Sequence, residues 1–246
     1  MKFRRFYFES LDSTNVRLAK LASEGAEEGT LVIAAEQTAG RGRRGRPWLS
    51  PPGKNIYASL LLHPDVSLLF VPQLALVAGL ALKDTIQIYL PNHEPSVKWP
   101  NDILLNGRKL SGILCETTKT GQVILGIGVN VNMVASDFDT DLQKKATSLL
   151  IEAGHDFDTS EVLDAFLNVF KRLYAEWLQA GSLEPFVDRL HDESLLTGRR
   201  VELNVGNRKV SGIVRGVAKT GELLLESDDG GIKAFSSGEA RLLPVG

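Results

Sequence analysis

The residue pattern of this chain changes near Leu195, and this change constrains the fold more than any other feature. Before it, one apolar stripe recurs at helical spacing and comprises Val162, Phe166, Val169, Phe170, Leu173 and Trp177. From about Leu196 onward, short apolar runs are broken by "VGN", "KTG" and "SDDGG", a pattern typical of a small all-β barrel. With 246 residues available, we expect two domains, residues 1–194 and residues 195–246.

The N-terminal part alternates predicted strands with predicted helices. Residues 3–8 and the runs "TLVIAAEQ", "NIYASLLL" and "QVILGIGVNVN" have the composition of strands. One helix should follow "LDSTN" and end at Gly25. A second should run roughly from Val71 to Tyr89, with Pro72 near its start, and its apolar character indicates burial on most faces.

The charge balance excludes several classes of protein. The 28 basic and 30 acidic residues give a formal charge of -2, which argues against a general nucleic-acid binder. The single Cys115 cannot form an intrachain disulfide, and no Cys/His cluster has zinc-site spacing. Since neither a signal-peptide core nor a long apolar run is present, we expect a cytoplasmic protein without membrane or nucleic-acid partners.

The stretch "GRGRRGRPW", Gly40 to Trp48, concentrates positive charge between two predicted strands. No acidic residue occurs between Gln37 and Pro64, so an empty loop would repel itself. Ordering about ten residues costs on the order of 10 kcal/mol, whereas one arginine near a phosphate returns about 4 kcal/mol at an effective dielectric constant of about 20. We therefore expect the loop to be a lid that closes over a ligand engaging several arginines. The alternatives are a surface loop without a function and an arm that binds nucleic acid.

A predicted hairpin in "KWPNDILLNGRKLSGILCE" carries a second group of candidate residues. Asn106-Gly107 is the strongest short hairpin signal, and Pro100 favours an extended residue before it. Strict alternation would place Lys109 on one face of the second strand with Ser111, Ile113 and Cys115. Lys109 could neutralise a carboxylate that approaches a phosphate, although an edge lysine with no such role is the alternative.

Two further motifs have less specific patterns. Ser13, Thr14 and Asn15 stand at a predicted helix start, where they either cap the helix or offer donors and acceptors to a neutral, ureido-like ligand. "GIGVNVN" lacks the third glycine and the following helix of a dinucleotide motif, so that interpretation is rejected.

Together and in this order, "LDSTN", "GRGRRGRPW", "KWPNDILLNGRKLSGIL" and "GIGVNVN" resemble the bacterial biotin protein ligases over nearly the whole chain. The resemblance implies an α+β fold, in which a mixed sheet with helices, akin to the catalytic domain of class II aminoacyl-tRNA synthetases, precedes an SH3-like β-barrel. It implies activation of biotin with ATP and Mg²⁺ to biotinyl-5'-adenylate. The biotinyl group would then pass to a lysine of a biotin carboxyl carrier domain, as in acetyl-CoA carboxylase.

The resemblance also implies roles for particular residues. Lys109, Arg41 and Asp102 would be catalytic, and Asp102 would organise either Mg²⁺ or the incoming lysine. The biotin site would comprise Ser13, Thr14, Asn15, Gln37, Gly40, Arg41, Gly42, Arg43, Lys109 and Gly112. The ATP and adenylate site would comprise Arg43, Arg46, Trp48, Lys109, Asn130 and Arg241.

Two expectations concern what the chain does not do. Only nine residues precede "SLDSTN", which leaves no room for the helix-turn-helix domain of some relatives, so operator binding is not expected. The resemblance implies a monomer or a weak homodimer. The nearest alternative activity is that of a lipoyl or octanoyl transferase or ligase, from which the pair "GRGRRG" and "KWPND" distinguishes this chain.

Overall fold

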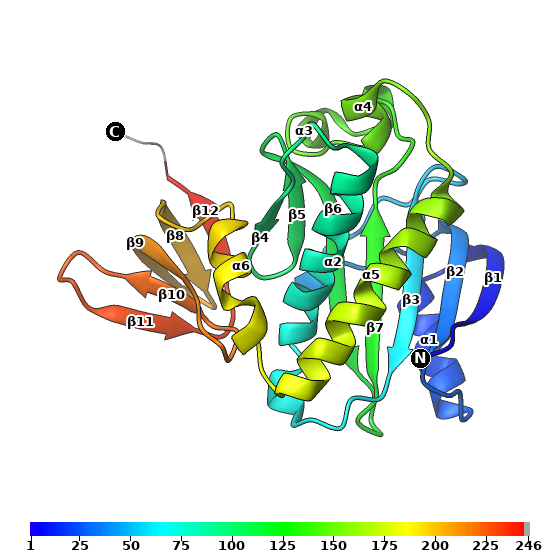
Figure 1. Ribbon diagram of the computed structural model, residues 1–246. Coiled ribbons are helices and arrows are strands. Elements are labelled where there is room, and N and C mark those ends of the chain that lie inside the picture. The colour runs from blue at the N-terminus through cyan, green and yellow to red at the C-terminus, as the bar shows by residue number, and fades with distance from the viewer. Residues whose placement is uncertain (244–246) are drawn as a thin grey trace.

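The computed structural model describes residues 1–243, which form a large mixed sheet and a smaller antiparallel one (Figure 1). The order of the seven-stranded sheet is β1-β2-β3-β7-β6-β5-β4. Its strands are β1 (Arg4–Leu11), β2 (Thr30–Gln37), β3 (Ile56–Leu62), β4 (Ser96–Lys98), β5 (Asp102–Leu105), β6 (Arg108–Thr117) and β7 (Val123–Val129). Because β1 and β2 pair in parallel and their neighbours antiparallel, the predicted mixed sheet is confirmed.

Helices cover the two faces of this sheet unequally. The long helices α2 (Gln73–Tyr89) and α5 (Thr159–Ala180) pack side by side on one face (Figure 1). α1 (Thr14–Ser23) packs on the opposite face, where Leu18 and Ala22 contact β2, β3 and β7. Since α1 is short, it leaves part of its face open, and the candidate site lies there.

Short elements connect these layers. They are η1 (Arg43–Gly45), η2 (Leu68–Phe70), η3 (Ala135–Asp137), α3 (Thr140–Gln143), α4 (Leu149–Ala153), η4 (Glu184–Phe186) and α6 (Val187–Asp192). The apolar stripe predicted for α5 faces the core, with Phe166, Phe170 and Trp177 each exposing 1% or less of their surface. None of the helices in residues 1–243 is long and apolar enough to cross a bilayer.

The hairpin of β5 and β6 forms as predicted, but with one irregularity. Asn106 and Gly107 make its two-residue turn with φ values of 51° and 74°. Further along, Ile103 pairs with Ser111 and Leu104 pairs with Lys109, so Leu110 is an extra residue that forms a β-bulge. The bulge reverses the alternation of side chains for the first residues of β6.

The prediction that Lys109 shares a face with Ser111, Ile113 and Cys115 is therefore wrong. The Ile113 side chain points toward Gly79 of α2, on the covered face of the sheet. Lys109 points the other way, because a Cβ built on Gly112 would lie 3.2 Å from Lys109 Nζ. The bulge thus moves this lysine from the core face to the open face.

The C-terminal residues form the small all-β unit that the sequence predicts. Its strands are β8 (Arg200–Val205), β9 (Arg208–Val217), β10 (Leu223–Glu226), β11 (Ile232–Phe235) and β12 (Glu239–Leu242), in the order β11-β10-β9-β8-β12. The turn after β9 contacts the large domain, where Trp99 Nε1 donates to Gly221 O over 3.1 Å and Gln73 Nε2 donates to Lys219 O over 3.4 Å. These contacts hold the unit beside the β4 edge of the large sheet (Figure 1).

Candidate active site

A cavity of about 560 Å³ opens on the α1 face of the large sheet. The N-terminus of α1, the arginine loop, β6, β7 and the start of β12 surround it. The predicted site residues that line it are Ser13, Thr14, Asn15, Gln37, Arg41, Gly42, Arg43, Arg46, Trp48, Asp102, Lys109, Gly112 and Asn130. Residues far apart in the sequence therefore meet in one cavity.

Three glycines of β6 and β7 form the floor of this cavity. A Cβ on Gly128 would lie 2.6 Å from the Trp48 indole, and one on Gly126 would lie 2.3 Å from Asn15 Oδ1. Gly112 pairs with Gly128 across the two strands and contacts the same indole. Sequence reasoning missed Gly126 and Gly128, although glycine at alternate positions of a buried strand is a signal for close approach of another group.

A buried polar cluster fills the end of the cavity beside α1. Ser13 is the N-cap residue, but its side chain makes no capping hydrogen bond. The neighbouring Thr14 N donates to Gln37 Oε1 over 2.9 Å, and Gln37 Nε2 donates to Ser50 Oγ over 3.0 Å. Asn15 also lies inside, with 4% of its surface exposed. Capping, the alternative role for this motif, is therefore not what these side chains do.

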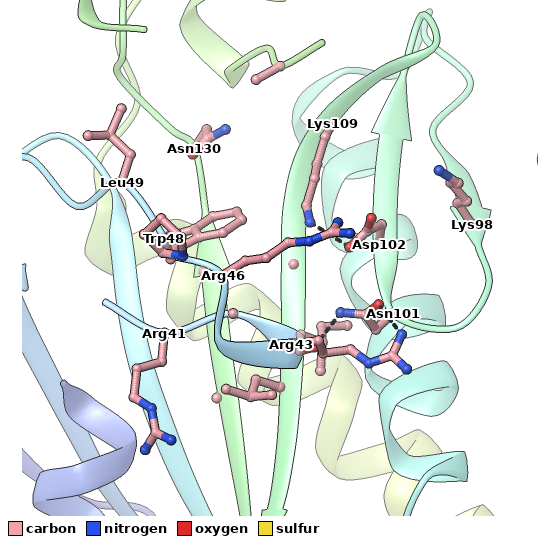
Figure 2. Close-up of a pocket in the computed structure, with 18 of the residues that line it drawn as sticks. Arg41, Arg43, Arg46, Trp48, Leu49, Lys98, Asn101, Asp102, Lys109 and Asn130 are labelled. Carbon is pink, nitrogen blue, oxygen red and sulfur yellow. Dashed lines mark hydrogen bonds and ion pairs between the residues drawn. The ribbon is translucent and has the colours of Figure 1, made fainter. Parts of the chain in front are cut away.

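Lys109 stands at the centre of the cavity, between an aspartate and an aromatic ring (Figure 2). Its Nζ lies 2.7 Å from Asp102 Oδ1 and 5.3 Å from the centroid of the Trp48 ring. The backbone of Lys109 is fixed as well, because its N donates to Lys145 O and its O accepts from Thr147 N. A lysine held in this way offers positive charge at one defined place.

The arginine loop finds its partners outside its own segment. Arg46 makes a two-pronged ion pair with Glu239 of β12, in which one Nη–Oε distance is 2.8 Å. The Arg46 guanidinium holds the pKa of the Glu239 carboxyl below its usual range. Arg44 approaches the same carboxylate at 3.8 Å. The acid-free loop thus receives its counter-charge from the C-terminal domain, which reasoning within the loop could not reveal.

The other two arginines point in different directions. Arg43 Nη1 donates to Asn101 Oδ1 over 3.1 Å, beside the Lys109–Asp102 pair (Figure 2). Burial lowers the pKa of the Arg43 guanidinium, although arginine keeps its charge at physiological pH. Arg41 points away from Lys109, and its Nη2 lies 3.7 Å from Glu116 Oε1.

Two predicted residues do not line the cavity. Gly40 lies behind it, where a Cβ would come within 2.4 Å of Trp48 O. Arg241 lines a separate hollow with Glu202 and Lys209, so the structure does not bring it to the predicted ATP site. β12 starts at the cavity and runs away from it, and Glu239 at its first position is the charged side chain that this strand contributes.

A wall that sequence reasoning missed closes the end of the cavity opposite α1. Phe138, Leu142 and the segment 144–146 form it. Asn130, the predicted adenosine contact, donates from Nδ2 to Thr147 O over 3.0 Å and so ties β7 to this segment. Its amide nitrogen therefore orders the wall, which lies next to Trp48 and Lys109.

The fold is that of biotin protein ligases of known structure. A structure titled as biotin protein ligase from Aquifex aeolicus in complex with biotin and ATP superposes with a TM-score of 0.85 at 32% identity, covering 98% of this chain and 99% of that one. The structure of the enzyme from Leishmania major with biotinyl-5-AMP gives a TM-score of 0.65 at 25% identity, covering 95% and 99% of the two chains.

Sequence comparison assigns the family. Residues 7–132 match the model of the biotin/lipoate A/B protein ligase family, and residues 196–243 match the biotin protein ligase C terminal domain. The biotin–[acetyl-CoA-carboxylase] ligase of Paracoccus denitrificans is 35% identical over 89% of this chain and 92% of that protein. The bifunctional ligase/repressor BirA of Bacillus subtilis is 37% identical over 94% and 72%, respectively. This chain belongs to the biotin protein ligases of that family.

Proposed function

We propose that this chain activates biotin with ATP to biotinyl-5'-adenylate and transfers the biotinyl group to a lysine of a biotin carboxyl carrier domain. The observation that carries the proposal is the cavity itself. It joins a buried neutral end, suited to a ureido ring, to a cationic end with Lys109 between them. The names of the relatives support biotin and acetyl-CoA carboxylase as the acid and the acceptor.

The first step needs two anions to meet. The biotin carboxylate attacks the α-phosphate of ATP, an oxygen–phosphorus bond forms, and pyrophosphate leaves. Lys109 lies where its charge offsets the repulsion between carboxylate and phosphate, and Arg43 and Arg46 can add to this field. Asp102 supplies the negative charge that Lys109 faces.

In the second step, the amine of the carrier lysine attacks the carbonyl carbon of the adenylate and AMP leaves. The amine must lose a proton, and Asp102 is a carboxylate within the cavity that can accept it. Its Oδ1 lies 2.7 Å from Lys109 Nζ, so this acceptor stands beside the ammonium proposed to bind the adenylate. Asp102 is also the residue that could hold Mg²⁺ together with ATP oxygens, since this ion uses few protein carboxylates when phosphates are present. Bound Mg²⁺ would neutralise phosphate charge.

The arginine loop is proposed to close over the adenylate. A mixed anhydride of carboxylate and phosphate hydrolyses easily, so water must be kept from it until the carrier arrives. Closure would replace the contacts of Arg41 and Arg43 with contacts to ligand. Biotin and ATP together should protect residues 41–48 from trypsin, whereas DNA or RNA should not. Unchanged cleavage with both ligands would count against the lid.

Biotin-dependent exchange of labelled pyrophosphate into ATP tests the first step. We expect exchange with biotin and ATP and none when biotin is omitted. Exchange with lipoic acid but not with biotin would overturn the proposal in favour of a lipoate ligase.

We also propose the domain boundaries, the oligomeric state, the location and the absence of nucleic-acid binding of this protein. We propose residues 1–194 and 195–246 as the two domains, a monomer or weak homodimer, a cytoplasmic location, and no binding to nucleic acid. The formal charge of -2 supports the last point. Sedimentation and filter-binding measurements would test the oligomeric state and nucleic-acid affinity.

A further inference from the structure

Glu116, near the end of β6, is a charged residue that the proposed reaction does not use. It lies beneath the neutral end of the cavity and has a partner on each carboxylate oxygen. Oε2 accepts from Asn15 Nδ2 over 2.7 Å, and Oε1 lies 3.7 Å from Arg41 Nη2. Its side chain is 34% exposed, whereas Asn15 is buried.

The partners of Asn15 give its amide a defined orientation. A carboxylate only accepts hydrogen bonds, so Asn15 must present Nδ2 to Glu116. Its Oδ1 then faces Ser59 Oγ, 2.6 Å away, on the fully buried β3. Gly126 leaves the room for this amide, because a Cβ there would lie 2.3 Å from Asn15 Oδ1.

The orientation of the Asn15 amide determines where the hydroxyl protons of Ser59 and Thr14 point. An amide oxygen only accepts, so the single proton of Ser59 is directed to Asn15. The Thr14 hydroxyl donates its proton to Gln37 Oε1 over 3.1 Å, and its oxygen lies 2.8 Å from Ser59 Oγ. Gln37 itself cannot turn over, because its Oε1 accepts from Thr14 N. Thr14 is thus left with lone pairs for the cavity.

We propose that Glu116 is a positioning residue that sets the hydrogen-bond polarity of this end of the cavity. Through Asn15 and Ser59 it makes Thr14 an acceptor, which selects a ligand with an N–H group, such as a cyclic ureide, over an acid without one. The inference rests on the proposed function and names a determinant of its substrate class.

The charge of Glu116 is the critical property. In Glu116→Gln the new amide can donate to Asn15 Oδ1. Asn15 could then turn over and donate to Ser59, and the Thr14 proton would no longer be confined to the wall. Since hydrogen bonds to charged groups are the strong ones, the affinity for biotin should fall about tenfold or more. Glu116→Asp keeps the charge and should lie between the wild type and Glu116→Gln.

A double-mutant cycle on biotin affinity, measured calorimetrically without ATP, tests this inference. In a Thr14→Val background, which lacks the hydroxyl, Glu116→Gln should have an effect at least about threefold smaller than in the wild type. Glu226→Gln, which removes the carboxylate paired with Arg215 in the C-terminal domain, is the matched control and should change nothing. Circular dichroism checks that each variant is folded.

The outcomes separate the two proposals. Wild-type affinity in Glu116→Gln, or an equal loss in both Thr14 backgrounds, would overturn the role of Glu116 alone. Coupling to Arg41→Ala but not to Thr14→Val would also overturn it, since Glu116 would then act through the loop. A wild-type protein that does not bind biotin would overturn the proposed function and this inference together.

Discussion

The two ends of the cavity are built in opposite ways. At the end beside α1, Thr14, Asn15 and Ser59 are neutral, expose 4% of their surface or less, and hydrogen-bond to one another before any ligand binds. At the other end, the side chains of Arg44 and Arg46 are 42% and 63% exposed and pair with a carboxylate of the C-terminal domain, that of Glu239. The first end is preorganised for recognition and the second can exchange partners. We therefore expect the end beside α1 to select the ligand and the arginine loop to close over it.

The largest effect is expected at Lys109, which joins the two ends. Lys109→Ala should slow adenylate formation by at least about a hundredfold, because removing one charge-stabilising group from a closed site has effects of this size. The rate of biotin-dependent pyrophosphate release measures it. Lys209→Ala, which removes an exposed lysine paired with Glu202 in the C-terminal domain, should have wild-type activity. Normal activity in Lys109→Ala would show that this lysine is structural.

A smaller effect is expected at the cationic end of the cavity. Arg43→Ala should loosen the loop and raise the release of free biotinyl-adenylate about tenfold, since one charged contact of this kind stabilises by about 1.5–3 kcal/mol. Chromatography of the free adenylate after single-turnover mixing measures this release. Arg200→Ala, which removes an arginine at the start of β8 that pairs with Asp228, is the control. Retention equal to wild type would contradict the role of the loop as a lid.

The contact between the loop and the C-terminal domain should matter least. Glu239→Gln should raise the Michaelis constant for ATP only about two- to fivefold, because exposed ion pairs contribute about 1 kcal/mol or less. Trypsin should also cleave faster after Arg44, which precedes Gly45. A change larger than about tenfold would show that Glu239 touches the ligand rather than the loop.

The same contact predicts the direction of a pH effect. Arg46 lowers the pKa of Glu239, so the ion pair contributes fully above the ordinary glutamate pKa and is lost as the pH falls through the lowered value. Cleavage of the loop by a protease active in acid should therefore be constant at pH values above about 5 and rise only below about 4. A rise near neutral pH would contradict this assignment.

The sequence predicts most of the fold, because its information is local. Apolar spacing locates α2, α5 and the strands, and Asn106-Gly107 locates a hairpin that forms with the expected turn. The bulge at Leu110 carries no such local signal, since an extra residue in a strand looks like ordinary alternation. For this reason strict alternation predicts the wrong face for Lys109.

The sequence predicts the parts of the candidate site that are formed by contiguous motifs. It does not predict the residues that contact these motifs from distant positions in the chain. The arginine loop and the residues at the start of α1 stand out in the sequence. Glu116 and Glu239 complete them from other strands, and neither carries a local pattern. The resemblance implies Arg241 for the ATP site, whereas Glu239 is the β12 residue that lines the cavity. The direction in which β12 runs from the cavity follows only from how the C-terminal unit docks.

Mass spectrometry of a purified biotin carboxyl carrier domain, incubated with this protein, ATP, Mg²⁺ and an equimolar mixture of biotin and lipoic acid, tests the central claim most directly. The account predicts one biotinyl group on the carrier lysine, formed only when ATP is present. A lipoylated carrier without biotinylated product, or an unmodified carrier under the same conditions, would contradict it.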